Sequence, residues 1–215
     1  MGEALGLPRE TAQLHLKTIR AAKQITFKGF GRSAAAMTER DAARLVIAAA
    51  GSYFAKDSAV ALKRFGGLRP ITKRTRLGAM LEECLAKCIA GLPMDLPPEE
   101  ESHRSPEWQQ RFGSRRLAET ALQLLDPMPR KEENDALPRY AILRWLNHHG
   151  GGEVLVFGPE GQRLERGTEI PDLLDLYSSH PFFQVRIVRR RALIDIAAAL
   201  KGVQPSYGNL HGSGR

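Results

Sequence analysis

The spacing of apolar residues changes near the middle of this chain, and this change limits the possible folds more than any single motif does. Up to residue 90, apolar residues recur at the three- and four-residue intervals of helices, whereas residues 139–188 contain short β-prone runs around glycines. Helices followed by strands along a chain are typical of α+β proteins. We therefore expect a mostly helical N-terminal part and a small, mixed α+β C-terminal part.

The helices of the N-terminal part have recognisable starts. Their expected ranges are 9–24, 38–50, 57–65 and 74–90. Pro8 stands where its missing N–H costs little, and Thr38 and Asp41 form a loose capping box. Asp57 or Ser58 can cap the third helix. These signals predict short helices joined by turns.

A proline-rich acidic segment at residues 93–105 is expected to link two domains. The N-terminal domain would span residues 1–92 and the C-terminal domain residues 106–202, followed by a disordered tail over 203–215. In the C-terminal domain we expect a helix, a hairpin around HHGGG, a second helix, a strand and a closing helix, at residues 106–125, 139–158, 171–177, 182–188 and 191–202. Residues 139–147 could also form a short helix. This domain would serve oligomerisation or partner binding.

Positive charge is concentrated near the start of the chain. Residues 1–80 hold 15 Lys and Arg against 5 Asp and Glu, whereas residues 81–215 hold 17 against 19. The net charge of +8 therefore originates in the first 80 residues. A basic domain joined to a near-neutral one is typical of nucleic-acid-binding proteins, and a solubilising charge bias is the alternative.

The first helix has the outer face that a DNA-reading helix needs. The residues of its apolar stripe are expected to pack inward: Ala12, Leu16, Ile19 and Ala22. The remaining faces carry Arg9, Thr11, Gln13, Leu14, Lys17 and Arg20. The amide of Gln13 can bind adenine with two hydrogen bonds, Leu14 can contact a thymine methyl group, and the cations can bind phosphates or guanine. We therefore expect these six residues to contact double-stranded DNA.

The opening stretch resembles the winged helix-turn-helix of bacterial and prophage-like transcription regulators over residues 1–40. The residues that carry the resemblance are Leu5, Gly6, Leu7, Thr11, Ala12, His15, Leu16, Lys17, Ile19, Arg20, Ala22 and Ile25. The resemblance implies that Thr11 opens a recognition helix and that a β-hairpin wing follows it. Residues 26–33 take the place of that wing, which implies that Lys28 and Arg32 contact the phosphate backbone.

Three features depart from the pattern of this family. Lys23 and Gln24 replace the usual Gly and Leu, so the helix must end without a glycine. Leu14 is apolar where a polar residue is common, so its alternative roles are a core residue or a dimer contact. Only four residues precede LGLP, where the family has a first helix. Either a later helix, for which 38–50 is our choice, covers the exposed side, or the fold is only winged-helix-like.

Other kinds of chemistry have little support in the sequence. We interpret Cys84 and Cys88 as small buried hydrophobes, because a metal would need two more ligands and no nearby His pair offers them. No nucleophile, general base or cofactor loop assembles, so we expect no enzyme, cofactor or metal. The basic run RIVRRR at 186–191 could contact phosphates or protect a strand edge. No apolar stretch could cross a membrane and no signal peptide is visible, which predicts a cytoplasmic, nucleoid-associated protein.

These observations lead to three hypotheses. The first is a sequence-specific transcription regulator that binds DNA as a homodimer, with helix 9–24 in the major groove. The second is a mobile-element DNA-packaging or replication protein similar to small terminase subunits, which would form higher oligomers. The third is a protein-interaction module that does not bind DNA.

Overall fold

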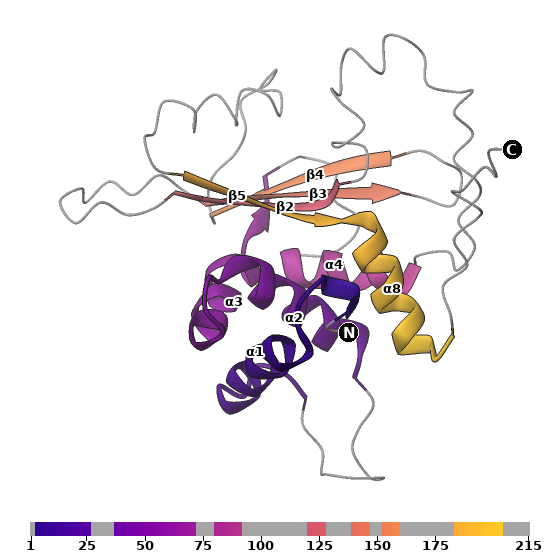
Figure 1. Ribbon diagram of the computed structural model, residues 1–215. Helices are drawn as coiled ribbons and strands as arrows, with labels where there is room; N and C mark the ends of the chain where they lie inside the picture. The colour runs from indigo at the N-terminus through magenta and orange to yellow at the C-terminus, as the bar shows by residue number, and fades with distance from the viewer. Residues whose placement is uncertain are drawn as a thin grey trace, which may run out of the picture.

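Helices lie on one face of an antiparallel sheet (Figure 1). The computed structural model describes residues 3–26, 37–71, 80–91, 120–127, 139–146, 152–159 and 183–203. Over these residues most helices come first along the chain and most strands later, as the change in apolar spacing predicts. The expected α+β fold class is therefore confirmed.

Short helices form most of the described part of the first 91 residues. Their bounds are Glu3–Leu5 for the 3-10 helix η1, Arg9–Ala21 for α1, Glu39–Gly51 for α2, Ala55–Asp57 for the 3-10 helix η3, Ser58–Gly66 for α3 and Leu81–Gly91 for α4. The capping box of α2 is present, because the Asp41 N–H donates to Thr38 Oγ1 and the Thr38 N–H donates to the Asp41 carboxylate. Asp57 is the N-cap residue of α3, but its side chain makes no capping hydrogen bond. The four expected helices are present in this part of the chain, but the first ends at Ala21 rather than at residue 24.

The described strands form one sheet in the order β1-β4-β3-β2-β5. Their bounds are Arg69–Pro70 for β1, Thr120–Pro127 for β2, Tyr140–Leu146 for β3, Gly152–Gly158 for β4 and Phe183–Arg189 for β5. β3 and β4 pair from Leu146 opposite Gly152 to Ala141 opposite Phe157, which is the expected hairpin. The strand expected at 182–188 is β5. The expected closing helix is α8, which spans Arg190–Lys201.

The helix expected at 106–125 is wrong where the structure describes it, because residues 120–127 form β2. This strand lies between β3 and β5 in the sheet. Leu122 and Leu124 are buried on the side of the helices, and Leu125 is buried in a separate cluster with Ile142 and Val156. Leu, Ala and Gln favour helices locally, but pairing on both edges and burial on both faces outweigh that preference.

Several expected elements lie outside the described residues. These are residues 106–119 of the expected helix, the linker at 93–105, the helix at 171–177, the turn at 147–151 and the tail from residue 204 onward. Their structure therefore stays a prediction.

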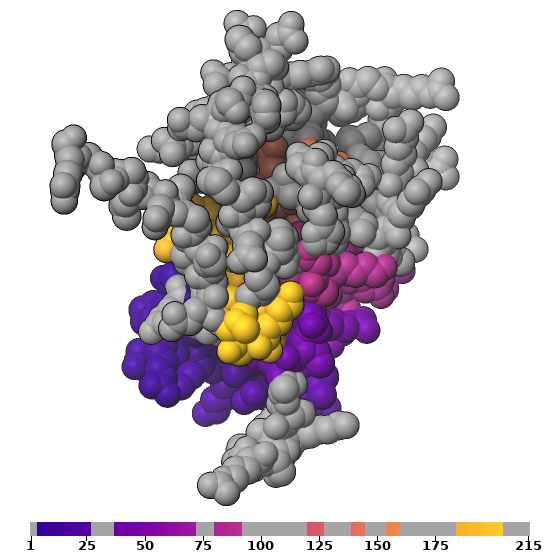
Figure 2. All heavy atoms as spheres, turned by 90° about the vertical axis from the view of Figure 1, so that its right-hand side faces the viewer, coloured from indigo at the N-terminus to yellow at the C-terminus, as the bar shows by residue number. Residues whose placement is uncertain are grey.

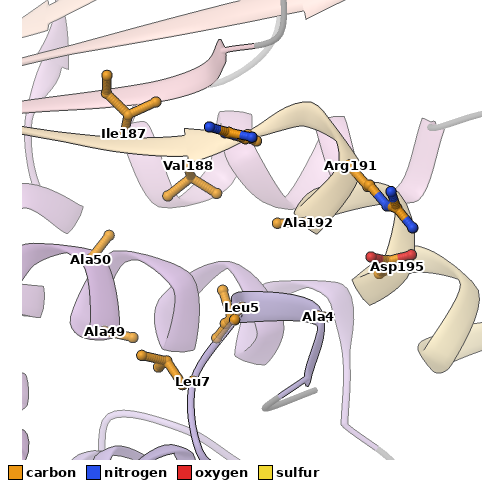
Figure 3. A pocket seen from close by; sticks show the side chains of 12 residues that line it. Ala4, Leu5, Leu7, Ala49, Ala50, Ile187, Val188, Arg191, Ala192 and Asp195 are labelled. Atoms are coloured by element: carbon orange, nitrogen blue, oxygen red, sulfur yellow. The ribbon is translucent and has the colours of Figure 1, made fainter. Parts of the chain in front are cut away.

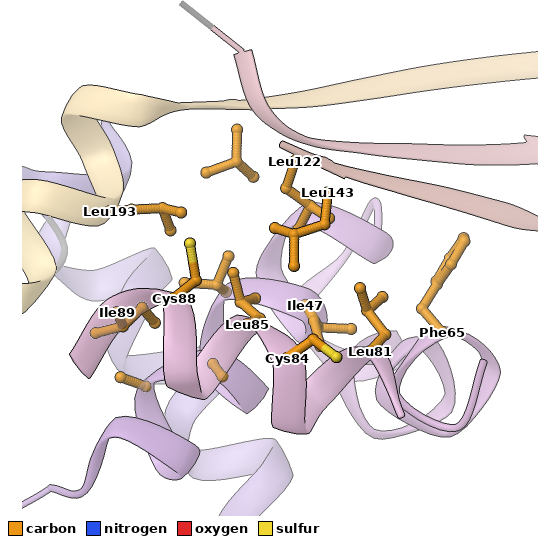
Figure 4. Packing of buried hydrophobic residues seen from close by; sticks show 14 of the residues in the cluster. Ile47, Phe65, Leu81, Cys84, Leu85, Cys88, Ile89, Leu122, Leu143 and Leu193 are labelled. Atoms are coloured by element: carbon orange, nitrogen blue, oxygen red, sulfur yellow. The ribbon is translucent and has the colours of Figure 1, made fainter. Parts of the chain in front are cut away.

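One hydrophobic core joins the helices to the sheet (Figure 4). In this core Leu85 and Cys88 of α4 lie opposite Leu122 and Leu143 of the sheet, with Leu193 of α8 beside them. Figure 2 shows α8, in yellow, packed among the indigo and purple atoms of the earlier helices. Described residues from both sides of the expected linker therefore pack into the same cluster.

Candidate nucleic-acid interface

Helix α1 is fixed to the rest of the protein by one face. Ala12, His15 and Ile19 are buried, and Leu16 is half-buried against the core. The expected place of Ala22 in this stripe is wrong, because α1 ends one residue before it and its side chain is exposed. The packing face of α1 is therefore shorter than the sequence suggests, and it includes a histidine.

His15 links α1 to the start of α3. Its Nδ1 atom lies 2.7 Å from Oγ of Ser58. The Ser58 hydroxyl donates its one hydrogen to the carbonyl of Ala55 at 2.6 Å, so Nδ1 of His15 must be the donor. Burial lowers the pKa of His15, which favours the neutral ring. This hydrogen bond fixes which face of α1 points outward.

The outward face of α1 carries most of the residues predicted to contact DNA. Five of the six on this helix have exposed side chains, namely Arg9, Gln13, Leu14, Lys17 and Arg20. Thr11 is half-buried. Leu14 is 54% exposed, which excludes a core role for it. Four-residue spacing places Arg9, Gln13 and Lys17 in one row along the helix.

Charge is balanced differently on α1 and on its neighbour α2. Between residues 9 and 23 one acid, Glu10, opposes four cations: Arg9, Lys17, Arg20 and Lys23. On α2, by contrast, Arg40 Nη2 lies 2.6 Å and Arg44 Nε 3.0 Å from the carboxylate of Glu82 on α4. The two α2 arginines therefore pair with a carboxylate of α4. The formal charge of residues 9–23 is positive.

The end of α1 is formed without glycine, as the departure from the family pattern requires. Lys23 adopts a left-handed conformation with φ of 56°. Its N–H donates to the carbonyl of Arg20, and the N–H of Gln24 donates to the carbonyl of Ile19, both at 2.9 Å. This pair of hydrogen bonds is a Schellman motif, which normally has glycine at the left-handed position.

Residues after this turn connect α1 to its neighbouring helices. The Gln24 carbonyl accepts from Arg44 at 2.7 Å, and its side-chain amide donates to the carbonyl of Ala59 at 3.1 Å. The N–H of Thr26 donates to Asp41 at 2.9 Å. The C-terminal end of α1 is thus tied to α2 and α3.

The inner face of α1 packs against elements that follow it in the chain. Helices α2 and α3 and the short η3 pack against α1, and among the described residues a single turn, η1, precedes it. Helix α2, which corresponds to the expected helix 38–50, therefore packs against α1, and whether it replaces a first helix of the family pattern stays a prediction. The predicted wing residues Lys28 and Arg32 lie outside the described residues. Ile25 and Thr26, just before them, are not in a strand.

Two exposed aromatic residues next to α1 were missed by the sequence reasoning. Tyr53 and Phe54 are 58% and 64% exposed and lie between α2 and η3, which packs against α1. The guanidinium of Arg186 lies 4.2 Å from the Tyr53 ring centre, and the ammonium of Lys56 lies 5.4 Å from that of Phe54. The available signal was two adjacent aromatics directly after a helix-ending Gly-Ser.

Metal binding and thiol chemistry find no support among the described residues. They contain no group of three or more His, Cys, Asp or Glu placed to bind a metal. Cys84 and Cys88 are buried free thiols, and burial raises their pKa values to about 11 and about 12. Both are therefore poor nucleophiles at neutral pH. Among the described helices, none is long and apolar enough to cross a membrane.

Comparisons with known proteins add no family to this description. The chain matches no family model, no curated protein and no solved structure. The geometry of α1 and its neighbours therefore carries the functional argument alone.

Proposed function

We propose that this protein binds double-stranded DNA, with α1 as the helix that enters the major groove. The observation that supports this best is the division of α1 into two faces. His15 and Ile19 hold one face against the protein, while Arg9, Gln13 and Lys17 form a row on the exposed face. A recognition helix needs this combination of a rigidly packed side and a polar, cationic side.

The dimensions of α1 suit this role. The helix has 13 residues and is therefore about 20 Å long. The major groove of B-DNA admits an α-helix, and an amide such as that of Gln13 can bind the edge of adenine with two hydrogen bonds. Lys17 and Arg9, at either end of the same row, would bind phosphates and hold the helix in register.

We further propose that the protein is a sequence-specific regulator that acts as a homodimer. A single helix of this length contacts few base pairs, so specific recognition calls for two copies that read two half-sites. Selection of bound sequences from random duplex DNA would then enrich an inverted repeat. Salt-sensitive binding with no enriched motif would instead favour a packaging or architectural role.

Two sets of substitutions separate base reading from backbone contact. Gln13→Ala should relax the base preference at one position, at a cost of about 1–3 kcal/mol for the preferred base. Lys28→Ala combined with Arg32→Ala should weaken binding to all sequences alike and reduce its salt dependence. Affinities for the selected sequence and for its point variants, measured by fluorescence anisotropy, distinguish the two patterns.

A matched control accompanies the double substitution. Lys87→Ala combined with Lys201→Ala removes the same charge from exposed positions on α4 and α8. We expect this control to bind DNA nearly as the wild type does. Equal effects of the two double variants, together with an unchanged base preference in Gln13→Ala, would contradict the placement of DNA on α1.

A further inference from the structure

A hollow opens between the start of the chain, the end of α2, the end of β5 and the start of α8 (Figure 3). Its volume is about 570 Å³, which lies within the ~300–1,000 Å³ range of small-molecule sites. In Figure 3 β5 runs above it, α8 borders it on the right, and η1 and α2 lie below. Segments that are far apart in the sequence therefore enclose one space.

The inner surface of this hollow is apolar. It is formed mainly by Leu5, Leu7, Ala50, Val188 and Ala192. Val188 is buried, whereas Ala50 and Ala192 are half-buried. An apolar body of a ligand would gain free energy by covering this surface.

The rim of the hollow on the side of α8 is charged. Arg189, Arg191 and Asp195 line it, and Figure 3 shows Arg191 and Asp195 side by side on the helix. Two cations against one acid give this rim a net positive charge. The chemistry that matches the whole hollow is therefore an apolar body with a negative head group.

We infer that the hollow binds a small amphipathic carboxylate. Its apolar body lies against Leu5, Leu7 and Val188, and its carboxylate lies at Arg189. Arginine suits this head group because its planar fork donates two parallel hydrogen bonds to a carboxylate.

The hollow is connected directly to the proposed DNA-reading helix. Leu5 and Leu7 line it, and α1 begins at Arg9, two residues after Leu7. Gly6, which lies between Leu5 and Leu7, has φ of 66°. L side chains rarely adopt this conformation, so the glycine sets the shape of the turn. A ligand on Leu5 and Leu7 stabilises one position of the turn and hence of α1. We therefore expect the ligand to change the affinity of the protein for DNA, an expectation that rests on the proposed function.

The direct test uses decanoate as the probe and decanol as its uncharged match, each titrated calorimetrically into the full chain. We expect one decanoate per chain and decanol binding about tenfold weaker, the scale of one charge-assisted hydrogen bond. Absence of saturable decanoate binding, or equal affinities for the two probes, would overturn the inference.

Substitutions test whether decanoate binds in the hollow. Arg189→Gln should weaken decanoate binding about tenfold without affecting decanol. Lys201→Gln, which removes the same charge at the other end of α8, should change neither affinity. Ala192→Phe fills the hollow and should abolish binding of both probes, and Ala50→Leu serves the same purpose if the first variant does not fold. A folded, filled variant that binds decanoate like the wild type would show that the site lies elsewhere.

The link to DNA is tested separately. Decanoate binding is measured without DNA, so a failure of the proposed DNA binding leaves the ligand site standing. If the protein binds DNA, saturating decanoate should shift its DNA affinity, and Ala192→Phe should remove that shift. An unchanged DNA affinity at saturating decanoate would show that the hollow and α1 are not coupled.

Discussion

At the scale of single residues, Lys23 occupies a backbone conformation that glycine adopts at lower cost. Its positive φ allows the two hydrogen bonds that close the end of α1. For a residue with a Cβ, the left-handed conformation brings that atom close to the following carbonyl oxygen. The side chain of Lys23 is exposed, so little packing offsets this strain.

Lys23→Gly should therefore raise the free energy of unfolding by about 0.5–1 kcal/mol, because glycine relieves the strain despite its greater flexibility in the unfolded chain. Lys17→Gly, at an exposed position inside α1, is the matched control and should lower that free energy by about 1 kcal/mol. Urea unfolding followed by circular dichroism measures both. A loss of stability in Lys23→Gly as large as in the control would contradict the assigned conformation.

His15 makes the attachment of α1 sensitive to pH. Its folded-state pKa is lowered by burial, so the unfolded chain takes up the proton first as the pH falls. The stability that the neutral ring provides is complete above its unfolded pKa of about 6.5 and is lost as the pH falls from there toward the lower folded value.

His15→Gln tests this dependence, because glutamine can still donate to Ser58 but does not titrate. As the pH falls below about 6.5, we expect the wild type to lose stability more steeply than the variant does. Urea unfolding at a series of pH values gives both slopes, and the other histidines contribute to both equally. Identical slopes would show that burial does not perturb His15.

At the scale of elements, α2 and α4 are joined by one buried carboxylate. Glu82 accepts hydrogen bonds from Arg40 at 2.6 Å and from Arg44 at 3.0 Å. Arg44 also donates to the carbonyl of Gln24, so this ion pair extends to the end of α1. Burial raises the pKa of Glu82, but the hydrogen bonds from Arg44 and Arg40 lower it further than burial raises it.

Glu82→Gln should lower the free energy of unfolding by about 3 kcal/mol, because it leaves two arginines without their shared carboxylate. Glu83→Gln, on the next and more exposed residue, should cost about 0.5 kcal/mol. The contribution of Glu82 is complete above its unfolded pKa of about 4.3 and is lost as the pH falls through its lower folded value. Chemical unfolding at neutral pH measures the losses in the two variants, and unfolding at acidic pH measures the pH dependence. Equal losses of stability in Glu82→Gln and Glu83→Gln would contradict the assigned role of Glu82.

The elements also show what the sequence could and could not predict. The capping box of Thr38 and the apolar spacing of α2, α3 and α4 are local signals, and they located these helices correctly. β2 was missed because Ala-Leu-Gln-Leu-Leu fits a helix as well as a buried strand, and its partners lie far away in the sequence. The bond between His15 and Ser58 depends on tertiary packing across 43 residues, so no local pattern could have indicated it.

At the scale of the whole molecule, α1 is an outlying helix on a core that belongs to the entire described chain. Leu85, Leu122 and Leu193 come from three distant segments and share one cluster. The rigidity of the proposed DNA-reading face thus depends on the sheet as well as on the N-terminal helices. The net charge of residues 1–80 gives this end of the molecule the electrostatic attraction that DNA binding uses.

The most direct test of the central claim is the affinity of the purified full chain for duplex DNA at ~50 mM and at ~200 mM salt. If α1 and its neighbouring cations bind several phosphates, the affinity should fall by about a hundredfold or more between these concentrations, because each contact releases counterions from the DNA. Absence of measurable binding at the lower concentration, or an affinity that does not change with salt, would contradict the proposed DNA-binding role of α1.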